Sequence, residues 1–132
     1  MKMQFRLPGG DLEYAVLAKL WALGSASARE IHEQVGKPAR LVYTTTAKVL
    51  DRLRVKRLVT RERKGRAFLY RPHVDRAVVE GARARDFLAR LVGPAPRSAA
   101  ATLVDAAESV DPKLLDELAE AIAARRRSKH GT

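Results

Sequence analysis

Apolar residues recur three and four positions apart near the start of the chain, which is the period of one face of a helix. The residues of this apolar stripe are Leu12, Val16, Leu20 and Leu23. They predict a helix over residues 11–23, in which Asp11 caps the first turn. Gly24 follows the last apolar position, where a glycine commonly ends a helix by adopting a left-handed conformation.

Two further helices are predicted in the first half of the chain. Ser27 and Glu30 form a capping-box pattern, in which each side chain bonds the backbone amide of the other residue. They begin a short second helix that ends in the turn at residues 36–38. A third helix is predicted over residues 41–56, and its apolar face comprises Val42, Thr46, Val49, Leu50 and Leu53. The opposite face of this helix is therefore expected to be exposed.

The hydrophobic period then changes from helical to extended. Residues 58–63 and 67–71 are β-prone runs on either side of Lys64-Gly65-Arg66, a pattern typical of a β-hairpin with a glycine-containing turn. Three helices followed by a hairpin are the order of a winged helix-turn-helix. In that fold the third helix enters the major groove of DNA, and the hairpin lies along the neighbouring phosphate backbone.

Three more helices are predicted after the hairpin, over residues 75–92, 97–108 and 112–127. The sequence Gly-Pro-Ala-Pro at residues 93–96 breaks the chain between the first two of them. Asp111 and Pro112 supply a cap and a first-turn proline for the last. The predicted fold class is therefore mainly α with a small β-hairpin, in which a winged-helix domain over residues 1–73 precedes a helical region over residues 74–132.

The charge of the chain is concentrated in its first half. The 132 residues include 26 Lys and Arg against 15 Asp and Glu, which gives a formal charge of +11. Residues 1–72 contain 16 basic and 6 acidic residues, whereas residues 73–132 contain 10 and 9. Ten basic residues against two acidic ones lie between Lys48 and Arg71, on the third helix and the hairpin. A winged helix lays these two elements on DNA, so we expect double-stranded DNA as the partner.

Polar side chains off the apolar stripe of the third helix are candidates for reading bases, because the opening turn of such a helix meets base edges. A threonine offers a hydroxyl to several bases and a methyl to thymine, and a lysine reaches a guanine edge or a phosphate. The predicted base-reading residues are Tyr43, Thr44, Thr45 and Lys48. The predicted phosphate-binding residues are Arg40, Arg52, Arg61, Arg63, Lys64 and Arg66.

Several other classes of protein find no support in the sequence. The chain contains no cysteine, which excludes disulfides and thiolate metal sites. His32, His73 and His130 stand apart from any metal-binding or catalytic motif and are predicted to be surface or capping residues. We therefore expect no enzyme, no metal and no cofactor. No segment is long and apolar enough to span a membrane, and we expect a cytoplasmic protein without a membrane partner.

A nonspecific nucleoid- or RNA-binding structural protein is the alternative function, because attraction to phosphate alone gives substantial affinity for nucleic acid. The aromatic content of 5% is low for a protein that stacks single-stranded bases. The two functions differ in the ratio of the affinities for an operator and for scrambled DNA.

Short motifs in a fixed order resemble the BlaI/MecI family of bacterial regulators, the penicillinase repressors. The matching motifs are Asp11 to Leu17, Leu20-Trp21, Tyr43-Thr44-Thr45, Val49 to Leu53, Leu58-Val59, Gly65-Arg66-Ala67 and Tyr70-Arg71-Pro72. The resemblance implies a homodimeric winged-helix repressor that binds palindromic operators in the promoters of resistance or stress genes. It also implies an operator-reading turn at Tyr43, Thr44, Thr45 and Lys48, and a wing at Arg63, Lys64 and Arg66.

In families of this kind the carboxy-terminal helices form the dimer. The predicted dimerisation residues are Val78, Phe87, Leu88, Leu91, Leu103, Val104, Leu115, Leu118 and Ile122. The low net charge of residues 73–132 favours such a contact, because two strongly basic surfaces would repel each other. The resemblance also offers a sensor protease of the BlaR/MecR type as a further partner.

The chain departs from the family pattern at two motifs. The family usually has Lys-Gly where this chain has Lys56-Arg57, so Arg57 replaces the glycine that ends the third helix. The best-known members are cleaved at an Asn-Phe bond, whereas this chain has Pro96-Arg97-Ser98 in that region. The absence of cysteine also excludes the Cys-x-Cys copper chemistry of the related CopY group.

Overall fold

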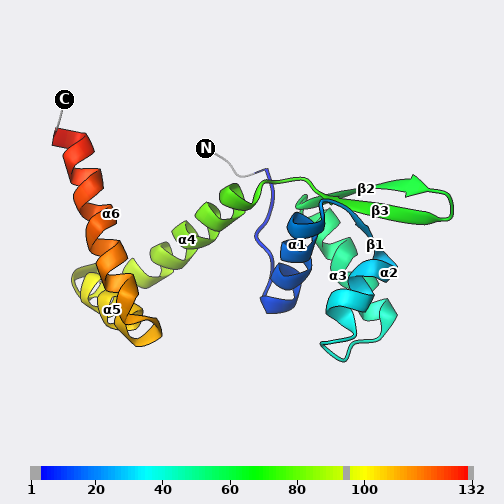
Figure 1. The fold of residues 1–132 in the computed structure, drawn as a ribbon, viewed down its shortest axis with the longest axis horizontal. Helices are drawn as coiled ribbons and strands as arrows, with labels where there is room; N and C mark the ends of the chain where they lie inside the picture. The colour runs from blue at the N-terminus through cyan, green and yellow to red at the C-terminus, as the bar shows by residue number, and fades with distance from the viewer. Residues whose placement is uncertain (1–3, 94–95, 131–132) are drawn as a thin grey trace. The chain divides into compact units, whose positions relative to one another are not determined.

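The structure, a computed structural model, describes residues 4–93 and 96–130. It divides into two compact units, Met1–Ala84 and Arg85–Thr132 (Figure 1). The boundary falls within helix α4 (Arg76–Val92), so the first turns of α4 belong to the first unit. Pro94 and Ala95, from the predicted break at residues 93–96, lie outside the described residues.

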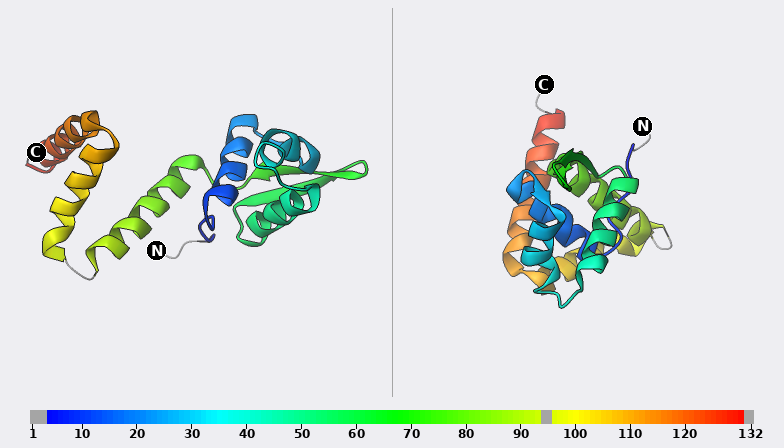
Figure 2. Two further views of the ribbon diagram at one scale, coloured as in Figure 1. Left: turned by 90° about the horizontal axis from the view of Figure 1, so that it is seen from below. Right: turned by 90° about the vertical axis from the view of Figure 1, so that its right-hand side faces the viewer.

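The first unit has the predicted order of three helical segments and a hairpin. Its elements before α4 are α1 (Asp11–Leu23), β1 (Ala26–Ser27), α2 (Ala28–Ile31), η1 (His32–Gly36), α3 (Tyr43–Val55), β2 (Val59–Lys64) and β3 (Ala67–Pro72). This order confirms the mainly α fold with a winged helix-turn-helix. Figure 2 shows that the tip of the β2–β3 hairpin extends past the helices of this unit, as a wing does.

Helix α1 has the predicted length, but Asp11 is not its N-cap. The N-cap is Gly10, with a φ of 105° and no capping side chain, and Asp11 is the first helical residue. The left-handed backbone at Gly10 turns the chain into the helix one residue earlier than the sequence pattern predicts. Gly24 ends the helix as predicted, with a φ of 83° and an amide that donates to the carbonyl of Leu20 at 2.7 Å.

The predicted capping box at Ser27 is present. The amide of Glu30 donates to Ser27 Oγ at 3.1 Å, and the amide of Ser27 donates to the Glu30 carboxylate at 2.9 Å. The helix continues as a π-helical turn, η1, closed by a bond from the amide of Lys37 to the carbonyl of His32 at 2.7 Å. Gly36 ends this turn so close to α3 that a Cβ would lie 2.2 Å from Thr46 Oγ1. Only a glycine fits there.

The β-structure is a three-stranded antiparallel sheet in the order β1-β3-β2, and not the two-stranded hairpin that the sequence predicts. Strand β1 comprises two residues, Ala26 and Ser27, that pair with Tyr70 and Leu69. Because β1 is so short and overlaps the capping box of α2, it has no period of its own in the sequence. The hairpin itself is confirmed, with β2 and β3 paired from Val59 to Lys64.

The core of the first unit lies between α1, α3 and the sheet. Its fully buried large side chains are Val16, Leu17, Leu20, Ile31, Val49, Leu50, Leu53, Leu58, Val59 and Val79. Thr46 joins the buried face of α3 as predicted, whereas Val42 does not, because it is the N-cap of α3 and is 66% exposed. Leu53 and Leu58, at the end of α3, link the helix to β2 inside this core.

The first turns of α4 are fixed to α1. Val79 is fully buried in the core, and the hydroxyl of Tyr14 donates to the carboxylate of Glu80 at 2.9 Å. The indole Nε1 of Trp21 donates to the carbonyl of Val74 just before α4, at 2.9 Å.

The second unit contains the end of α4 together with α5 (Pro96–Val110) and α6 (Pro112–His130). Helices α5 and α6 pack against each other, and Ala99 and Ala107 of α5 are buried. Asp111 caps α6 as predicted, since its carboxylate accepts from the amide of Lys113 at 3.0 Å. No described residue of α6 is buried. The helical part of this unit therefore exposes much of its apolar surface.

Candidate nucleic-acid interface

Helix α3 presents its opening turn at the surface. Tyr43 is its first residue, and Val42 leads into it with an extended backbone. Thr44 and Lys48 are four residues apart, so they lie on the same face, and both are exposed. Thr45 is half-buried beside them. The structure thus exposes three of the four predicted base-reading side chains and leaves the fourth partly accessible.

The ring of Tyr43 is held by two side chains from the preceding helical segment. The His32 ring meets it edge-to-face, with ring centroids 5.6 Å apart and an interplanar angle of 89°. The guanidinium of Arg29 lies 5.7 Å from the centroid of the same ring. His32 is itself fixed, because its Nδ1 lies 2.8 Å from Thr46 Oγ1 within hydrogen-bonding distance.

Of the two predictions for His32, a surface or a capping residue, the first is wrong, whereas its backbone does cap the end of α2. Its side chain is buried with only 8% exposed, between η1 and α3. The π-helical turn and the glycine at position 36 allow this approach, and neither is visible in the hydrophobic period. The structure therefore assigns His32 and Arg29 to the support of the opening turn, which sequence reasoning missed.

The helical segment before α3 and α3 itself end in the same type of turn. After α3, the amide of Leu58 donates to the carbonyl of Leu53 at 2.9 Å and that of Arg57 donates to the carbonyl of Arg54 at 3.0 Å, which is a Schellman motif. The turn before α3 has the same pair of bonds, with Arg40 in the equivalent position. Arg40 and Arg57 have φ values of 61° and 65°. Arg57 therefore adopts the turn that a glycine usually makes.

The wing carries arginines on one face. In the hairpin register, Arg61 lies opposite Tyr70 and Arg63 opposite Phe68. Both guanidinium groups lie over the half-buried ring of Phe68, at 3.9 Å for Arg61 and 4.9 Å for Arg63. Neither arginine is in an ion pair within residues 4–93 and 96–130, and both are exposed. Their charges are therefore free to meet phosphate.

The other face of the hairpin carries a carboxylate between two cations. Glu62 pairs with Arg71 at 2.9 Å and lies 3.9 Å from Lys64. The turn at the tip contains Gly65 in a left-handed conformation with a φ of 63°, flanked by the exposed side chains of Lys64 and Arg66. The tip of the hairpin is therefore cationic, with Arg66 in no ion pair of the described chain.

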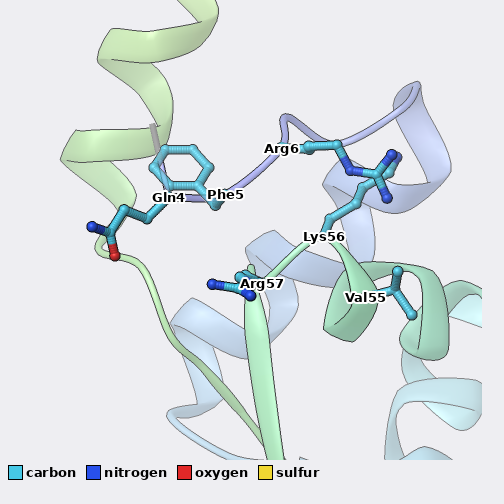
Figure 3. A pocket seen from close by; sticks show the side chains of 6 residues that line it. All are labelled: Gln4, Phe5, Arg6, Val55, Lys56 and Arg57. Carbon is cyan, nitrogen blue, oxygen red and sulfur yellow. The ribbon is translucent and has the colours of Figure 1, made fainter. Parts of the chain in front are cut away.

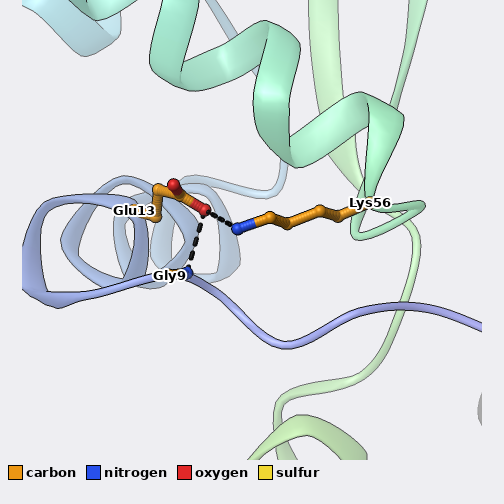
Figure 4. A network of polar contacts seen from close by, with 3 residues as sticks. All are labelled: Gly9, Glu13 and Lys56. Carbon is orange, nitrogen blue, oxygen red and sulfur yellow. Dashed lines mark hydrogen bonds and ion pairs between the residues drawn. The ribbon is translucent and has the colours of Figure 1, made fainter.

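An ion pair between α1 and the residue that follows α3 fixes α3 to the rest of the unit. The Lys56 ammonium donates to Glu13 Oε1 at 2.6 Å, and the amide of Gly9 donates to the same oxygen at 3.0 Å (Figure 4). Burial by itself raises the pKa of Glu13. The hydrogen bonds from Lys56 and Gly9 and the positive charges of Lys56 and Arg52 together lower the pKa by more than burial raises it. The pKa of Glu13 in the folded protein therefore lies below its ordinary value. Arg52 itself is exposed, as a phosphate-binding residue must be.

The predicted dimerisation residues lie mostly at the surface of the single chain. In the first unit Val78 is 49% exposed, and its neighbour Val79 is the buried one. In the second unit Phe87, Leu88, Val104 and Ile122 are exposed, with fractions between 40% and 54%. The remaining four, which are half-buried, are Leu91, Leu103, Leu115 and Leu118.

The described residues hold neither of two features that would indicate other functions. No group of three His, Asp or Glu side chains in residues 4–93 and 96–130 is placed to hold a metal ion. Over the same ranges, no helix has the length and apolar character needed to cross a membrane.

Comparison with known proteins agrees with this geometry. The profile of the penicillinase repressor family matches residues 9–124. The transcriptional regulator BlaI of Mycobacterium tuberculosis is 36% identical over 115 residues, which cover 86% of this chain and 82% of that protein. The solved DNA-binding domain of the repressor BlaI matches with a TM-score of 0.51 at 25% identity, over 56% of this chain and 92% of that domain.

The family resemblance and the winged-helix fold predicted from the sequence are thereby confirmed. Penicillinase repressors are transcriptional repressors, which are not a class of enzyme. The chain belongs to the penicillinase repressor family.

Proposed function

We propose that this protein is a sequence-specific transcriptional repressor that binds a palindromic operator as a homodimer. The observation that carries the proposal is the pairing of an exposed helix start with a basic wing. Thr44 and Lys48 share an exposed face of α3, and Arg61 and Arg63 lie on one face of the hairpin without an ion-pair partner among the described residues. The first pair suits base edges, and the second suits phosphate.

We propose two roles for the residues of this basic surface. Tyr43, Thr44, Thr45 and Lys48 read bases in the major groove. The residues proposed to hold the phosphate backbone are Arg40, Arg52, Arg61, Arg63, Lys64 and Arg66. The positions of Tyr43 and of its supports His32 and Arg29 favour this division, because a clamped ring keeps a single orientation toward the groove.

A homodimer follows from the size of the reading surface. One recognition helix contacts few base pairs, whereas a twofold dimer places two of them about 34 Å apart on an inverted repeat. The exposed apolar residues of α4, α5 and α6 supply a surface for a second copy. Residues 73–132 have 10 basic and 9 acidic residues, so two protomers can meet there with little repulsion.

The proposed site of action is the bacterial chromosome, at promoters of resistance or stress genes, and hence the cytoplasm. Repression follows from occupancy of the promoter, which excludes the polymerase. The relative from Mycobacterium tuberculosis has the name of a transcriptional regulator, and we carry that role to this chain as part of the proposal.

The ratio of two affinities tests the proposal. Fluorescence anisotropy at about 150 mM salt compares a palindromic fragment retrieved from the genome with a scrambled fragment of the same composition. We expect the palindrome to bind at least about 10³-fold more tightly. Equal affinities for the two fragments would instead support a nonspecific nucleoid- or RNA-binding protein.

A further inference from the structure

Three hollows in the surface of the first unit share the side chain of Arg57. One, of about 350 Å³, lies between the last turn of α3 and the start of β2. A second, of about 280 Å³, lies between the same turn and residues 4–6 (Figure 3). A third, of about 310 Å³, extends toward the start of α4 and includes Val78. The end of the recognition helix, the root of the wing and the start of α4 therefore meet around Arg57.

The first of these, the α3–β2 hollow, has a strongly basic lining. Its lining residues are Arg54, Arg57, Val59, Thr60, Arg61 and His73. Three of them carry a permanent positive charge, the Thr60 hydroxyl can donate a hydrogen bond, and no acidic residue is among the described residues of the lining. The α3–β2 hollow is thus complementary in charge to a compact anion.

Arg54 is part of this lining, but its guanidinium already has a partner. Arg54 donates through Nη2 to Asp51 Oδ1 at 2.7 Å, and its Nε is buried, so an anion in the hollow cannot reach that atom. Guanidinium groups favour the paired oxygens of phosphate and carboxylate. The guanidinium of Arg61 lies over the Phe68 ring, which leaves that of Arg57 as the candidate to hold an oxyanion.

The backbone of Arg57 is a second, independent observation. Its φ of 65° lies in the left-handed region, which is strained for any residue with a Cβ. Strained positions persist where the surrounding structure holds them, and they cluster at functional sites. Within the described chain the Arg57 guanidinium is in no ion pair, and Figure 3 shows it directed away from Arg6 and Lys56. The turn therefore places a cation without an ion-pair partner among the described residues in the lining of this hollow.

We propose that the α3–β2 hollow binds a compact oxyanion, either a phosphate or a carboxylate group, through the Arg57 guanidinium and the Thr60 hydroxyl. The bound oxyanion has two candidate sources. A phosphate of the DNA backbone is the first, and this source rests on the proposed function. A free small anion is the second, and it is independent of DNA. In both cases the anion bridges the end of α3 to β2, so it couples the recognition helix to the wing.

The free anion is tested on the full chain without DNA. Sodium phosphate is titrated at constant ionic strength while ¹H–¹⁵N spectra report the amides of Arg57, Thr60 and His73. We expect saturable shifts at these amides, with the apparent Kd at least about tenfold weaker in Arg57→Gly. Arg126→Ala removes the same charge from exposed α6 and should bind like the wild type. Arg57→Asn, which also tolerates the left-handed backbone, repeats the test if the glycine variant folds poorly.

The DNA phosphate is tested by salt dependence. For each variant, log Kobs for one duplex is plotted against log[NaCl], and each lost phosphate contact reduces the slope by about 0.9. A slope reduced by about 1 in Arg57→Gly and unchanged in Arg126→Ala supports a DNA phosphate as the source of the anion. The same comparison can be made on nonspecific DNA if the wild type recognises no operator. Saturable phosphate binding without a change in slope supports the free anion. The proposal is overturned if Arg57→Gly matches the wild type in both measurements, or if Arg126→Ala shows the same losses.

Discussion

Arg40 and Arg57 hold left-handed backbone positions at the two turns that bracket the recognition helix. For residues with a Cβ this conformation costs about 1–2 kcal/mol each. The chain keeps the turns because both Schellman bonds form, and because Leu53 and Leu58 are fully buried where the second turn closes. At each position the chain therefore has a positively charged side chain in a backbone conformation that a glycine would adopt without strain.

Replacement of Arg57 by glycine should therefore stabilise the fold. The relief of about 1–2 kcal/mol exceeds the additional chain entropy of glycine, about 0.5–1 kcal/mol, so we expect a net gain of roughly 0.5–1 kcal/mol and a Tm higher by a few degrees. Thermal unfolding followed by circular dichroism measures the change. Arg40→Gly, in the matching turn, should change Tm in the same direction. A lower Tm in both variants would contradict the strain that we assign to these turns.

The ionised form of Glu13 should make stability depend on pH. The pKa of Glu13 is lowered in the folded state, so its contribution is complete above the pKa of an unfolded glutamate, about 4.3, and is lost as the pH falls through the folded value. Glu13→Gln should cost about 2 kcal/mol at pH 7, because it leaves the half-buried Lys56 without its partner. This cost should shrink as the pH falls below about 4.

Urea unfolding at pH 7, 5, 4 and 3 measures both effects. Glu33→Gln is the matched control, since Glu33 pairs with Lys37 at the surface and its loss should change stability little at any pH. If the two variants showed the same pH profile, the ion pair in Figure 4 would not be the one that stabilises the unit.

The exposure of residues that we propose to contact DNA could be predicted from the sequence, but the side chains that support them could not. Exposed polar positions follow directly from the apolar stripe of the third helix, and the structure exposes Thr44 and Lys48 accordingly. His32 escaped prediction because its burial depends on a close approach at Gly36, which is a feature of two segments in contact. A single-segment pattern contains no information about that contact.

At the scale of elements, substitutions in α3 and in the β2–β3 hairpin should have different effects on DNA binding. Thr44→Ala removes a proposed base contact, so we expect a loss of about 1–3 kcal/mol of discrimination at one base position with little change in nonspecific affinity. Arg63→Ala should weaken all duplexes alike and reduce the salt slope by about 1. Competition titrations with operator and random duplexes separate the two effects. Equal losses on both kinds of DNA from both variants would refute the assigned roles.

The helices and strands could be predicted where the segment is long enough to show several repeats of its hydrophobic pattern. The helices of residues 11–23 and 112–127 and the hairpin appear where the patterns predict them, with ends that differ by a few residues. Strand β1 and the π-helical turn η1 were not predicted, because one comprises two residues and the other replaces a regular helical turn. Val42 was misplaced because an N-cap residue leaves the helical face even when it continues the apolar spacing.

At the scale of the whole molecule, the net charge of +11 divides between two tasks. Residues 1–72 carry nearly all of it, on the winged helix that we propose to meet DNA. Residues 73–132 are close to neutral and expose the apolar side chains that we propose to join two protomers. Charge and hydrophobic surface are thus separated along the chain, which suits the dimeric DNA-binding protein that we propose.

Selection from a random DNA library tests the central claim most directly, because the library contains every candidate half-site and no operator has to be chosen in advance. The purified full chain is incubated with random duplexes at about 150 mM salt, and the retained fragments are sequenced over several rounds. We predict one enriched inverted repeat, with half-sites about 10 base pairs apart from centre to centre or a multiple of that spacing. Retained fragments without a shared motif would contradict the claim.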